Sequence, residues 1–546
     1  MIESGRRRLR AQLAAVCVSI LAVVAATPVV QGVYSDAANQ LKAVQQKLAH
    51  ESTSINVSVH PDSADLSKDS SLWIMWWTPG TQLVVYPLMR AGLSLGGALR
   101  VVAAVALIAG AVGWATWFSY FAMPDAVLLA LAAIFPCVRY GSNSLFLYSA
   151  ETLVFAAGPW MLVATVLFLG ANRPRPRGHM FHAILGLGLG SAYWLKDSLA
   201  FVVVGALVTV AIVEWRAHSR PLVGWLSRCA AIGVGAAIPF VTLSTMNRVY
   251  GGASTKVAVG LASHLVNWRF VVDALALPAL QMTDTFSLWD YVLMHPSHPV
   301  LHDVIWLSVI GVPGGALMWW LFIRPTVTST AGLLARSVLV CSLAILVGIW
   351  TISAAVDHMP RHIATAAFAI LPLVIAEGWQ RWPRLAGIGR MVLAGAGLFY
   401  VCLPLAYGAV SVVAKVRRFP SGYRPGPAHI YNPQLAEHDV AAVRETLLAR
   451  TSPDAVWYLS DPLSALDLPG RSIAVSADFE LLDDLKQSTY VTSTPLKVRA
   501  LFPARFETDG KGEVIRHSFR QAGPWTSEKI SGSDYWLWTA DLTAGH

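Results

Sequence analysis

Apolar residues are grouped along most of the chain into long runs that are separated by polar loops. A helix needs about 20 consecutive apolar residues to cross the hydrocarbon core of a bilayer. The pattern therefore predicts a mainly α-helical membrane bundle of about eleven transmembrane helices. We expect these helices near residues 11–33, 101–121, 125–140, 152–170, 181–196, 198–214, 229–246, 301–323, 333–354, 363–378 and 389–414.

Two of the polar stretches between predicted spans are long, at about residues 34–100 and 247–300. The first contains apolar positions at helical spacing, which predict an amphipathic helix lying on the membrane surface. These positions are Ala37, Leu41, Val44 and Leu48.

Basic residues orient the predicted bundle, because loops on the cytoplasmic side of a membrane retain Lys and Arg. Arginines before the first span place the N-terminus in the cytoplasm; a signal peptide ending near Ala25 is the alternative, but the run is long enough to span. Residues 79–97 are apolar but contain Arg90 and four glycines, so they are predicted to be juxtamembrane or re-entrant. With that assignment, the loops predicted inside carry Arg173, Arg175, Arg177, Arg216, Arg220, Arg228, Arg324, Arg336, Arg381, Arg384 and Arg390.

The chain turns polar after the last predicted span. Eleven crossings from a cytoplasmic start leave residues 416–546 outside, so we expect a transmembrane domain at 1–415 followed by a small extracytoplasmic α/β domain. The expected helices are residues 440–450 and 479–485, and the expected strands are 455–459 and 535–538. No GxGxxG, metal-ligand spacing or nucleophile elbow occurs there, which favours a structural or acceptor-presenting role.

Composition agrees with the bilayer as solvent. The chain is 55% hydrophobic and 13% charged, whereas a soluble domain carries about 25% charged residues. Its net charge is +9, but the basic residues are scattered in short clusters between apolar runs. Membrane topology therefore explains the charge better than a nucleic-acid partner does. All five cysteines lie in apolar runs, which argues against a disulfide framework or a thiolate metal site.

Charged residues at the ends of spans are the candidates for chemistry, because an ionisable group near hydrocarbon is costly and is usually retained for a site or a pathway. Asp36 follows the first span, Glu151 begins the fourth, Lys196 ends the fifth, and Arg361-His362 opens the tenth. All are predicted at the outer face, so we expect one polar cavity. A carboxylate there can deprotonate an acceptor hydroxyl while Lys and Arg neutralise a leaving phosphate, which suits sugar transfer from a phosphate-linked donor.

Each position also has a simpler explanation. Asp36 could be an exposed loop residue, and Glu151 could pair with Arg139. Lys196 could extend to the membrane interface, as lysines near span ends commonly do. Arg361 could pair with Asp357 or anchor lipid head groups.

A divalent metal ion is left open by the sequence, and no other cofactor is predicted. His295 and His298 lie three positions apart in the second long loop, with His302 following. Prolines interrupt the spacing, and loop histidines are usually polar surface, so these residues are weak metal candidates.

Several motifs occur in a fixed order over about residues 11–415. They are Tyr34-Ser35-Asp36-Ala37-Ala38, Thr78-Pro79-Gly80-Thr81-Gln82-Leu83 with Tyr86-Pro87-Leu88, Arg139-Tyr140-Gly141 leading to Glu151, Gly186-Leu187-Gly188-Leu189-Gly190 leading to Lys196, and Arg361-His362. In this order the sequence resembles the GT-C superfamily of polytopic glycosyltransferases, which includes protein O-mannosyltransferases and aminoarabinose transferases that modify lipid A. The chain lacks the second acidic residue that many members carry directly after the Asp.

The resemblance implies an inverting glycosyltransferase at the outer face of the inner (cytoplasmic) membrane. It would move a sugar from a polyprenyl-phosphate or polyprenyl-diphosphate donor to a lipid, glycan or protein acceptor. Asp36 would act as base or acceptor-positioning group, with Glu151 in support. Donor phosphate would be held by Lys196 and Arg361 together with Arg139 and His362, and grooves between helices would hold the prenyl chain.

Two other functions remain as alternatives. A polymerase or ligase of surface polysaccharide shares many spans and outer loops, but it would concentrate its polar residues in one long late loop rather than around the first. A secondary transporter would show internal pseudo-repeats and charges at span centres, whereas most charges here lie at span ends.

Overall fold

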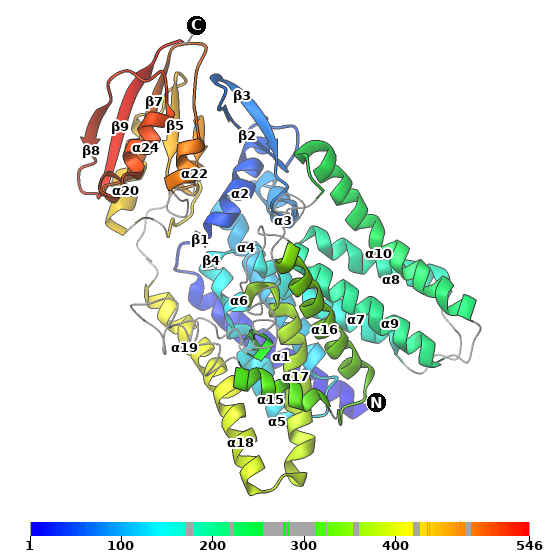
Figure 1. Ribbon diagram of the computed structural model, residues 1–546. Coiled ribbons are helices and arrows are strands. Elements are labelled where there is room, and N and C mark those ends of the chain that lie inside the picture. The colour runs from blue at the N-terminus through cyan, green and yellow to red at the C-terminus, as the bar shows by residue number, and fades with distance from the viewer. Residues whose placement is uncertain are drawn as a thin grey trace.

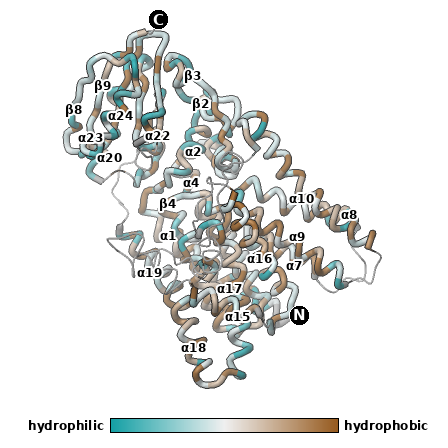
Figure 2. Tube along the Cα trace, in the orientation of Figure 1, coloured by the Kyte–Doolittle hydropathy of each residue, from teal (hydrophilic) through white to brown (hydrophobic). Residues whose placement is uncertain are grey.

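The computed structural model is a bundle of helices with a small sheet at one end (Figure 1). It describes residues 2–170, 178–217, 222–254, 277–279, 281–282, 312–323, 325–352, 360–418, 426–433, 435, 437–468, 470–475 and 482–544. The N-terminal end of helix α1 (Ile2–Ala26) and the C-terminal sheet lie at opposite ends of the bundle (Figure 1). Hydrophobic residues cover the bundle helices, whereas the sheet and the segments beside it are mostly pale or hydrophilic (Figure 2).

Within the described residues, seven helical segments are long and apolar enough to cross a membrane. A helix pair bent by 44°, Asp125–Cys137 with Arg139–Leu145, makes an eighth if it is one span. The seven segments are Gly5–Ala26 in α1, Leu95–Phe118 (α4), Glu151–Leu169 (α7), Asp197–Arg216 with α9 (Ala200–Ala217), Leu222–Gly251 (α10), Thr330–Ile352 (α16), and Gly387–Arg417 with α18 (Gly387–Gly397), η8 (Leu398–Cys402) and α19 (Leu403–Arg418).

The predicted membrane bundle is therefore confirmed, but the count of eleven spans is not reached among the described residues. Three of the predicted spans coincide with α8 (His179–Ser191), α15 (Val312–Ile323) and α17 (Ala364–Arg381), none of which meets the length and hydropathy of a span. With 13 residues, α8 is shorter than the roughly 20 that cross a bilayer. The ionisable Glu377 and Arg381 make the end of α17 too polar.

Some arginines that oriented the bundle in the sequence analysis also make structural ion pairs. Arg228 Nε lies 2.8 Å from Glu214 Oε2, and Arg336 Nη2 lies 2.5 Å from the buried Glu377 Oε1. Removing one partner of such a pair leaves a charge uncompensated, so Arg228 and Arg336 stabilise the packing of their helices. The arginines at 173, 175, 177, 220 and 324 lie outside the described residues.

The bent pair has an identifiable cause. Pro136 sits in the short helix η1 (Phe135–Cys137), between α5 (Asp125–Ile134) and α6 (Arg139–Ser142). Proline lacks the N–H that a continuing helix needs, so α5 ends there. The Phe135 ring packs edge-on against Trp114 of α4 and Phe368 of α17, with ring centroids 5.6 and 5.1 Å away. These contacts fix the bend within the main core.

The first long loop is folded against the protein. It follows β1 (Gly32–Val33) and contains α2 (Ser35–Leu48), an antiparallel hairpin of β2 (Val57–Asp62) and β3 (Asp65–Trp73), and α3 (Gly80–Arg90). The amphipathic helix is confirmed as α2, but its predicted place on the membrane surface is wrong. Leu41 and Val44 are fully buried in a core with Val85 of α3 and residues of α4 and the C-terminal region, so the apolar face of α2 contacts protein.

Residues 79–97 do not form a span, as predicted. The helix α3 ends at Arg90 and α4 starts at Leu95. Gly92 has φ +99°, a left-handed conformation that only glycine adopts readily, so it permits the tight turn between the two helices.

The C-terminal region forms a five-stranded sheet in the order β6-β5-β7-β9-β8. Its strands are β5 (Ala455–Leu459), β6 (Ser472–Ala474), β7 (Leu496–Pro503), β8 (Thr526–Lys529) and β9 (Tyr535–Leu542). Its helices are α20 (Glu437–Ala449), α21 (Ser464–Asp467), α22 (Leu482–Gln487), α23 (Arg505–Thr508) and α24 (Lys511–Ser518). On β5, which lies between β6 and β7, Trp457 packs with α20 on one face and Tyr458 packs with α22 and α24 on the other.

The predicted helix at 440–450 and the predicted strands at 455–459 and 535–538 are confirmed. The predicted helix at 479–485 is observed from Leu482, because residues 479–481 lie outside the described part of the chain.

Candidate active site

A small cavity of about 150 Å³ lies where the first turns of α2 and α7 meet the start of α6 and the segments before α9 and α17. Five of the residues singled out in the sequence line it, and they are Asp36, Arg139, Glu151, Lys196 and Arg361. The structure thus brings together groups from distant parts of the sequence. His362, in the short helix η6 (Pro360–His362), is not among the lining residues.

The two carboxylates are positioned by a pair of two-residue strands. Val33 of β1 pairs in parallel with Tyr148 of β4 (Leu147–Tyr148), and Tyr34 N donates to Tyr148 O at 3.0 Å. Asp36 and Glu151 each follow the paired residue by three positions and lie in the first turn of a helix, α2 and α7 respectively. Helix N-termini favour negative charge, so both carboxylates are set where an ionised group is stabilised.

Gly32 makes this strand pair possible. A Cβ at Gly32 would lie 2.6 Å from the Leu147 side chain and 2.8 Å from Phe146 O. Its N–H donates to Phe146 O at 2.7 Å. The close approach of the two backbones therefore requires glycine, and a larger residue would displace Asp36 relative to Glu151.

Lys196 lies between the short helices η3 (Ala192–Trp194) and η4 (Asp197–Leu199), in extended backbone. Its Nζ is 3.7 Å from Glu151 Oε1, and the two side chains are 12% and 15% exposed. This ion pair is largely shielded from water, so its charges are screened less than those at the surface.

The glycine-rich run before Lys196 has a packing role. Cβ atoms at Gly186 and Gly190 would lie 2.1 and 2.4 Å from the Ile232 and Ala236 carbonyl oxygens of α10. The spacing is the small-xxx-small pattern that lets two helices touch along their backbones. The run therefore fixes α8 against α10 and sets the position from which Lys196 reaches the cavity.

Arg361 pairs with the other carboxylate. Its Nη1 lies 3.3 Å from Asp36 Oδ2, and the side chains are 36% and 57% exposed. Arg139 begins α6 on another wall of the same cavity. The cavity thus combines two carboxylates with three cationic side chains, an arrangement that can bind a phosphate and accept a proton from a hydroxyl.

Further polar and aromatic lining residues were not predicted from the sequence; they include Tyr34, Gln40, Trp77, Tyr140 and Asn143. Asn143 Nδ2 donates to the Tyr34 hydroxyl at 3.0 Å, and Gln40 Nε2 donates to Thr78 O at 2.8 Å. Helical spacing was the available signal for Gln40, since it lies one turn after Asp36 on α2.

Among the described residues, no group of three or more His, Cys, Asp or Glu side chains could hold a metal ion. The weak metal candidates His295 and His298 lie outside the described residues.

An apolar cavity of about 610 Å³ lies between helices of the bundle. Its walls come from α5, α15, α17, α18, η8 and α19, and include Leu131, Leu317, Val374, Leu393, Tyr400 and Leu405. The bent pair therefore touches both cavities, since α5 lines the apolar one and α6 lines the polar one.

No protein-family model and no curated protein matches the chain. Six solved chains are similar to it. One is the crystal structure of ArnT from Cupriavidus metallidurans bound to undecaprenyl phosphate, which is 12% identical over 97% of this chain and 98% of that chain, with a TM-score of 0.48.

Proposed function

We propose that this chain is an integral membrane glycosyltransferase of the GT-C kind, which moves a sugar from a polyprenyl-phosphate donor to a hydroxyl of an extracytoplasmic acceptor. The observation that carries the proposal is the set of two carboxylates and three cations lining one small cavity beside the ends of membrane helices. The order of the motifs that deliver these residues, which resembles that superfamily, supports it.

The charged groups have two roles in the proposed reaction. The acceptor hydroxyl oxygen attacks the anomeric carbon of the sugar and forms the new C–O bond. The bond between that carbon and the phosphate oxygen breaks, and its electron pair leaves with polyprenyl phosphate. The hydroxyl proton passes to the Asp36 carboxylate, so Asp36 acts as general base.

Cations stabilise the charge that develops on the leaving phosphate. Arg361 presents a planar guanidinium that can bind two phosphate oxygens at once, and Lys196 adds a point charge. Glu151 holds Lys196 in place through the 3.7 Å ion pair. Arg139 lies on the same wall as Tyr140 and completes the phosphate site.

The apolar cavity suits the prenyl chain. Its walls are almost free of polar groups, as a hydrocarbon ligand requires. Because α5 lines this cavity and α6 lines the polar one, a donor could follow the bent pair from its hydrocarbon tail to its phosphate.

A cytoplasmic N-terminus, inferred from the basic residues before α1, would place the polar cavity and the C-terminal sheet on the outer face of the inner membrane. The N-terminal end of α1 and the C-terminal sheet lie at opposite ends of the bundle (Figure 1). This orientation is part of the proposal.

The test is mass spectrometry of envelope glycans, lipids and proteins from a strain that lacks the chain. One sugar substituent should be missing, and the wild-type chain should restore it. Asp36→Asn should not restore it at equal protein abundance, whereas the exposed control Asp509→Asn in the C-terminal region should. Restoration by Asp36→Asn would remove Asp36 from the mechanism.

A further inference from the structure

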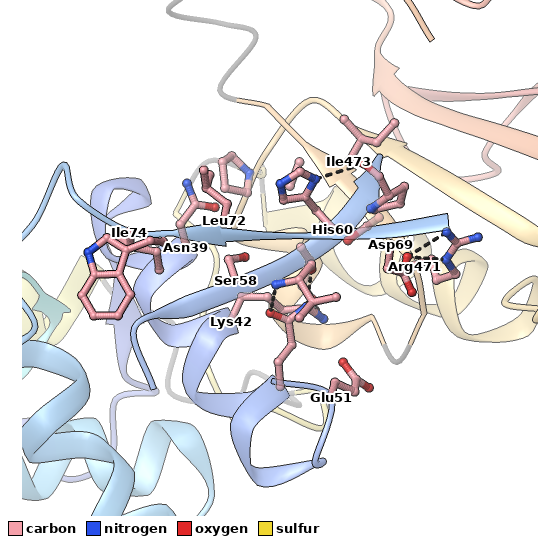
Figure 3. Close-up of a pocket in the computed structure, with 18 of the residues that line it drawn as sticks. Asn39, Lys42, Glu51, Ser58, His60, Asp69, Leu72, Ile74, Arg471 and Ile473 are labelled. Carbon is pink, nitrogen blue, oxygen red and sulfur yellow. Dashed lines mark hydrogen bonds and ion pairs between the residues drawn. The ribbon is translucent and has the colours of Figure 1, made fainter. Parts of the chain in front are cut away.

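A third cavity, of about 880 Å³, adjoins the small charged one, since the two share Trp77. It is enclosed by α2, the β2–β3 hairpin, residues 74–77 and the edge of the C-terminal sheet at β6 (Figure 3). Trp77 lines both cavities. Asp36 lines the small cavity and Asn39 lines the large one, and three positions along a helix put both on one face about 5 Å apart.

The walls of the large cavity are held together by contacts between the first loop and the C-terminal region. Arg471, just before β6, donates from Nε and Nη2 to Asp69 of β3 at 2.9 and 2.7 Å. At the hairpin tip, Leu66 N donates to Val491 O at 2.8 Å. In Figure 3 the Asp69–Arg471 pair closes one end, and Asn39 and Ile74 lie at the other. These contacts therefore fix the walls of the cavity relative to one another.

Both aromatic rings and hydrogen-bonding groups line the large cavity. Three tryptophans line it, at positions 73, 76 and 77. Trp73 is fixed, because its Nε1 donates to Asn247 Oδ1 at 2.9 Å and its ring lies 5.2 Å from that of Tyr250. Trp76 is 45% exposed. The polar lining residues include Asn39, Lys42, Ser58, His60 and Glu51.

We propose that this cavity binds the saccharide chain of the acceptor, so that its terminal hydroxyl reaches Asp36 past Trp77; the inference rests on the proposed function. The C–H faces of sugar rings stack on indoles, and their hydroxyls need donors and acceptors around the rim. The volume is near the upper end of ligand sites, about 300–1,000 Å³, which suits several sugar rings. A lipid tail would bring no hydrogen-bonding groups to the polar residues that line the large cavity.

The test uses the full-length chain in nanodiscs. Tryptophan fluorescence measures its binding of linear arabino-, manno- and gluco-oligosaccharides of two to six residues. One of these series should bind. Trp76→Ala should weaken binding about tenfold, because a stacking platform is lost, while Trp76→Phe should keep most of it. Asn39→Trp, which fills the cavity from an exposed position on α2, should abolish binding. Trp215→Ala, which removes an exposed ring from α9, is the matched control.

A second experiment measures the affinity for the same saccharide when it is attached to a lipid. Equal affinity for both forms identifies a polysaccharide as the source, and tighter binding of the lipid-linked form identifies a glycolipid; either result supports the cavity as the saccharide site. Asp36→Asn should bind the saccharide like the wild type. Failure of every series to bind, or unchanged binding by both Trp76→Ala and Asn39→Trp, would overturn this inference while leaving the Asp36 test untouched.

Discussion

Arg361 Nη1 lies 3.3 Å from Asp36 Oδ2, although the two residues are 325 positions apart in the chain. Both side chains are partly exposed, at 36% and 57%. Ion pairs with this exposure contribute about 0–1 kcal/mol. The pair is therefore weak enough for a donor phosphate to replace Asp36 as the partner of Arg361, which would leave the carboxylate free to accept a proton.

Arg361→Ala should weaken donor binding. A hydrogen bond to a charged group contributes about 1.5–3 kcal/mol, which corresponds to roughly 10–150-fold in affinity. The apparent KM for the donor, measured with membranes from the deletion strain, should rise by that factor in Arg361→Ala. In Arg361→Lys this KM should rise less. Arg90→Ala, at the exposed end of α3, is the control. An unchanged KM in Arg361→Ala would exclude the phosphate role.

Glu151 and Lys196 should be coupled in stability. Both side chains are largely buried, so removing either partner leaves an uncompensated charge that costs about 3 kcal/mol. Glu151→Gln and Lys196→Met should each lower the midpoint of thermal unfolding, and the double variant should lose less than the sum of the two. Strictly additive losses would show that the pair does not interact.

Lys42 connects the helix that carries Asp36 to the C-terminal region. Its Nζ donates to Ala465 O at 2.9 Å and to Leu468 O at 3.0 Å. Lys42→Met should loosen this contact, speed protease cleavage in the C-terminal region and lower transfer by about tenfold, as expected when a catalytic group is slightly misplaced. Lys47→Met, on the same helix but with its Nζ donating to the nearby Thr53 O, is the matched control. Equal effects of the two variants would contradict the positioning role.

Stability of the C-terminal region should fall as the pH rises from about 4 toward neutral. Burial raises the pKa of Asp461 above its ordinary 3.8, although Asn432 and Ser464 donate to it. Between 3.8 and the raised pKa the folded chain binds more protons than the unfolded chain, so the free energy of unfolding decreases with pH. Asp461→Asn should flatten this dependence in thermal unfolding between pH 4 and pH 7, whereas Asp509→Asn should keep it. A steeper fall in Asp461→Asn would contradict the assignment.

The sequence located the charged residues because charge at the end of an apolar run is a strong signal. Asp36, Glu151, Lys196 and Arg361 stand out for that reason alone, and their roles remain predictions. The β1–β4 strand pair that positions the two carboxylates could not be predicted, because each strand is two residues long and has no periodicity.

The place of α2 was predicted wrongly for a different reason. An apolar stripe on a helix has the same pattern whether it faces lipid or protein. Its partner residues in α21 are more than 400 positions away, and nothing local in the sequence indicates them. The hairpin at 57–73 was not predicted, because polar residues make up most of β3 and β2 contains a proline.

The central claim is that Asp36 deprotonates an acceptor during sugar transfer from a polyprenyl-phosphate donor. The most direct measurement is the release of polyprenyl phosphate, detected by mass spectrometry, when purified protein is added to membranes of the deletion strain, which retain unused donor and acceptor. Wild type should release it, and Asp36→Asn should do so about 10²–10⁴-fold more slowly, the usual contribution of a general base. Release by Asp36→Asn at the wild-type rate, or no release by the wild type, would contradict the account.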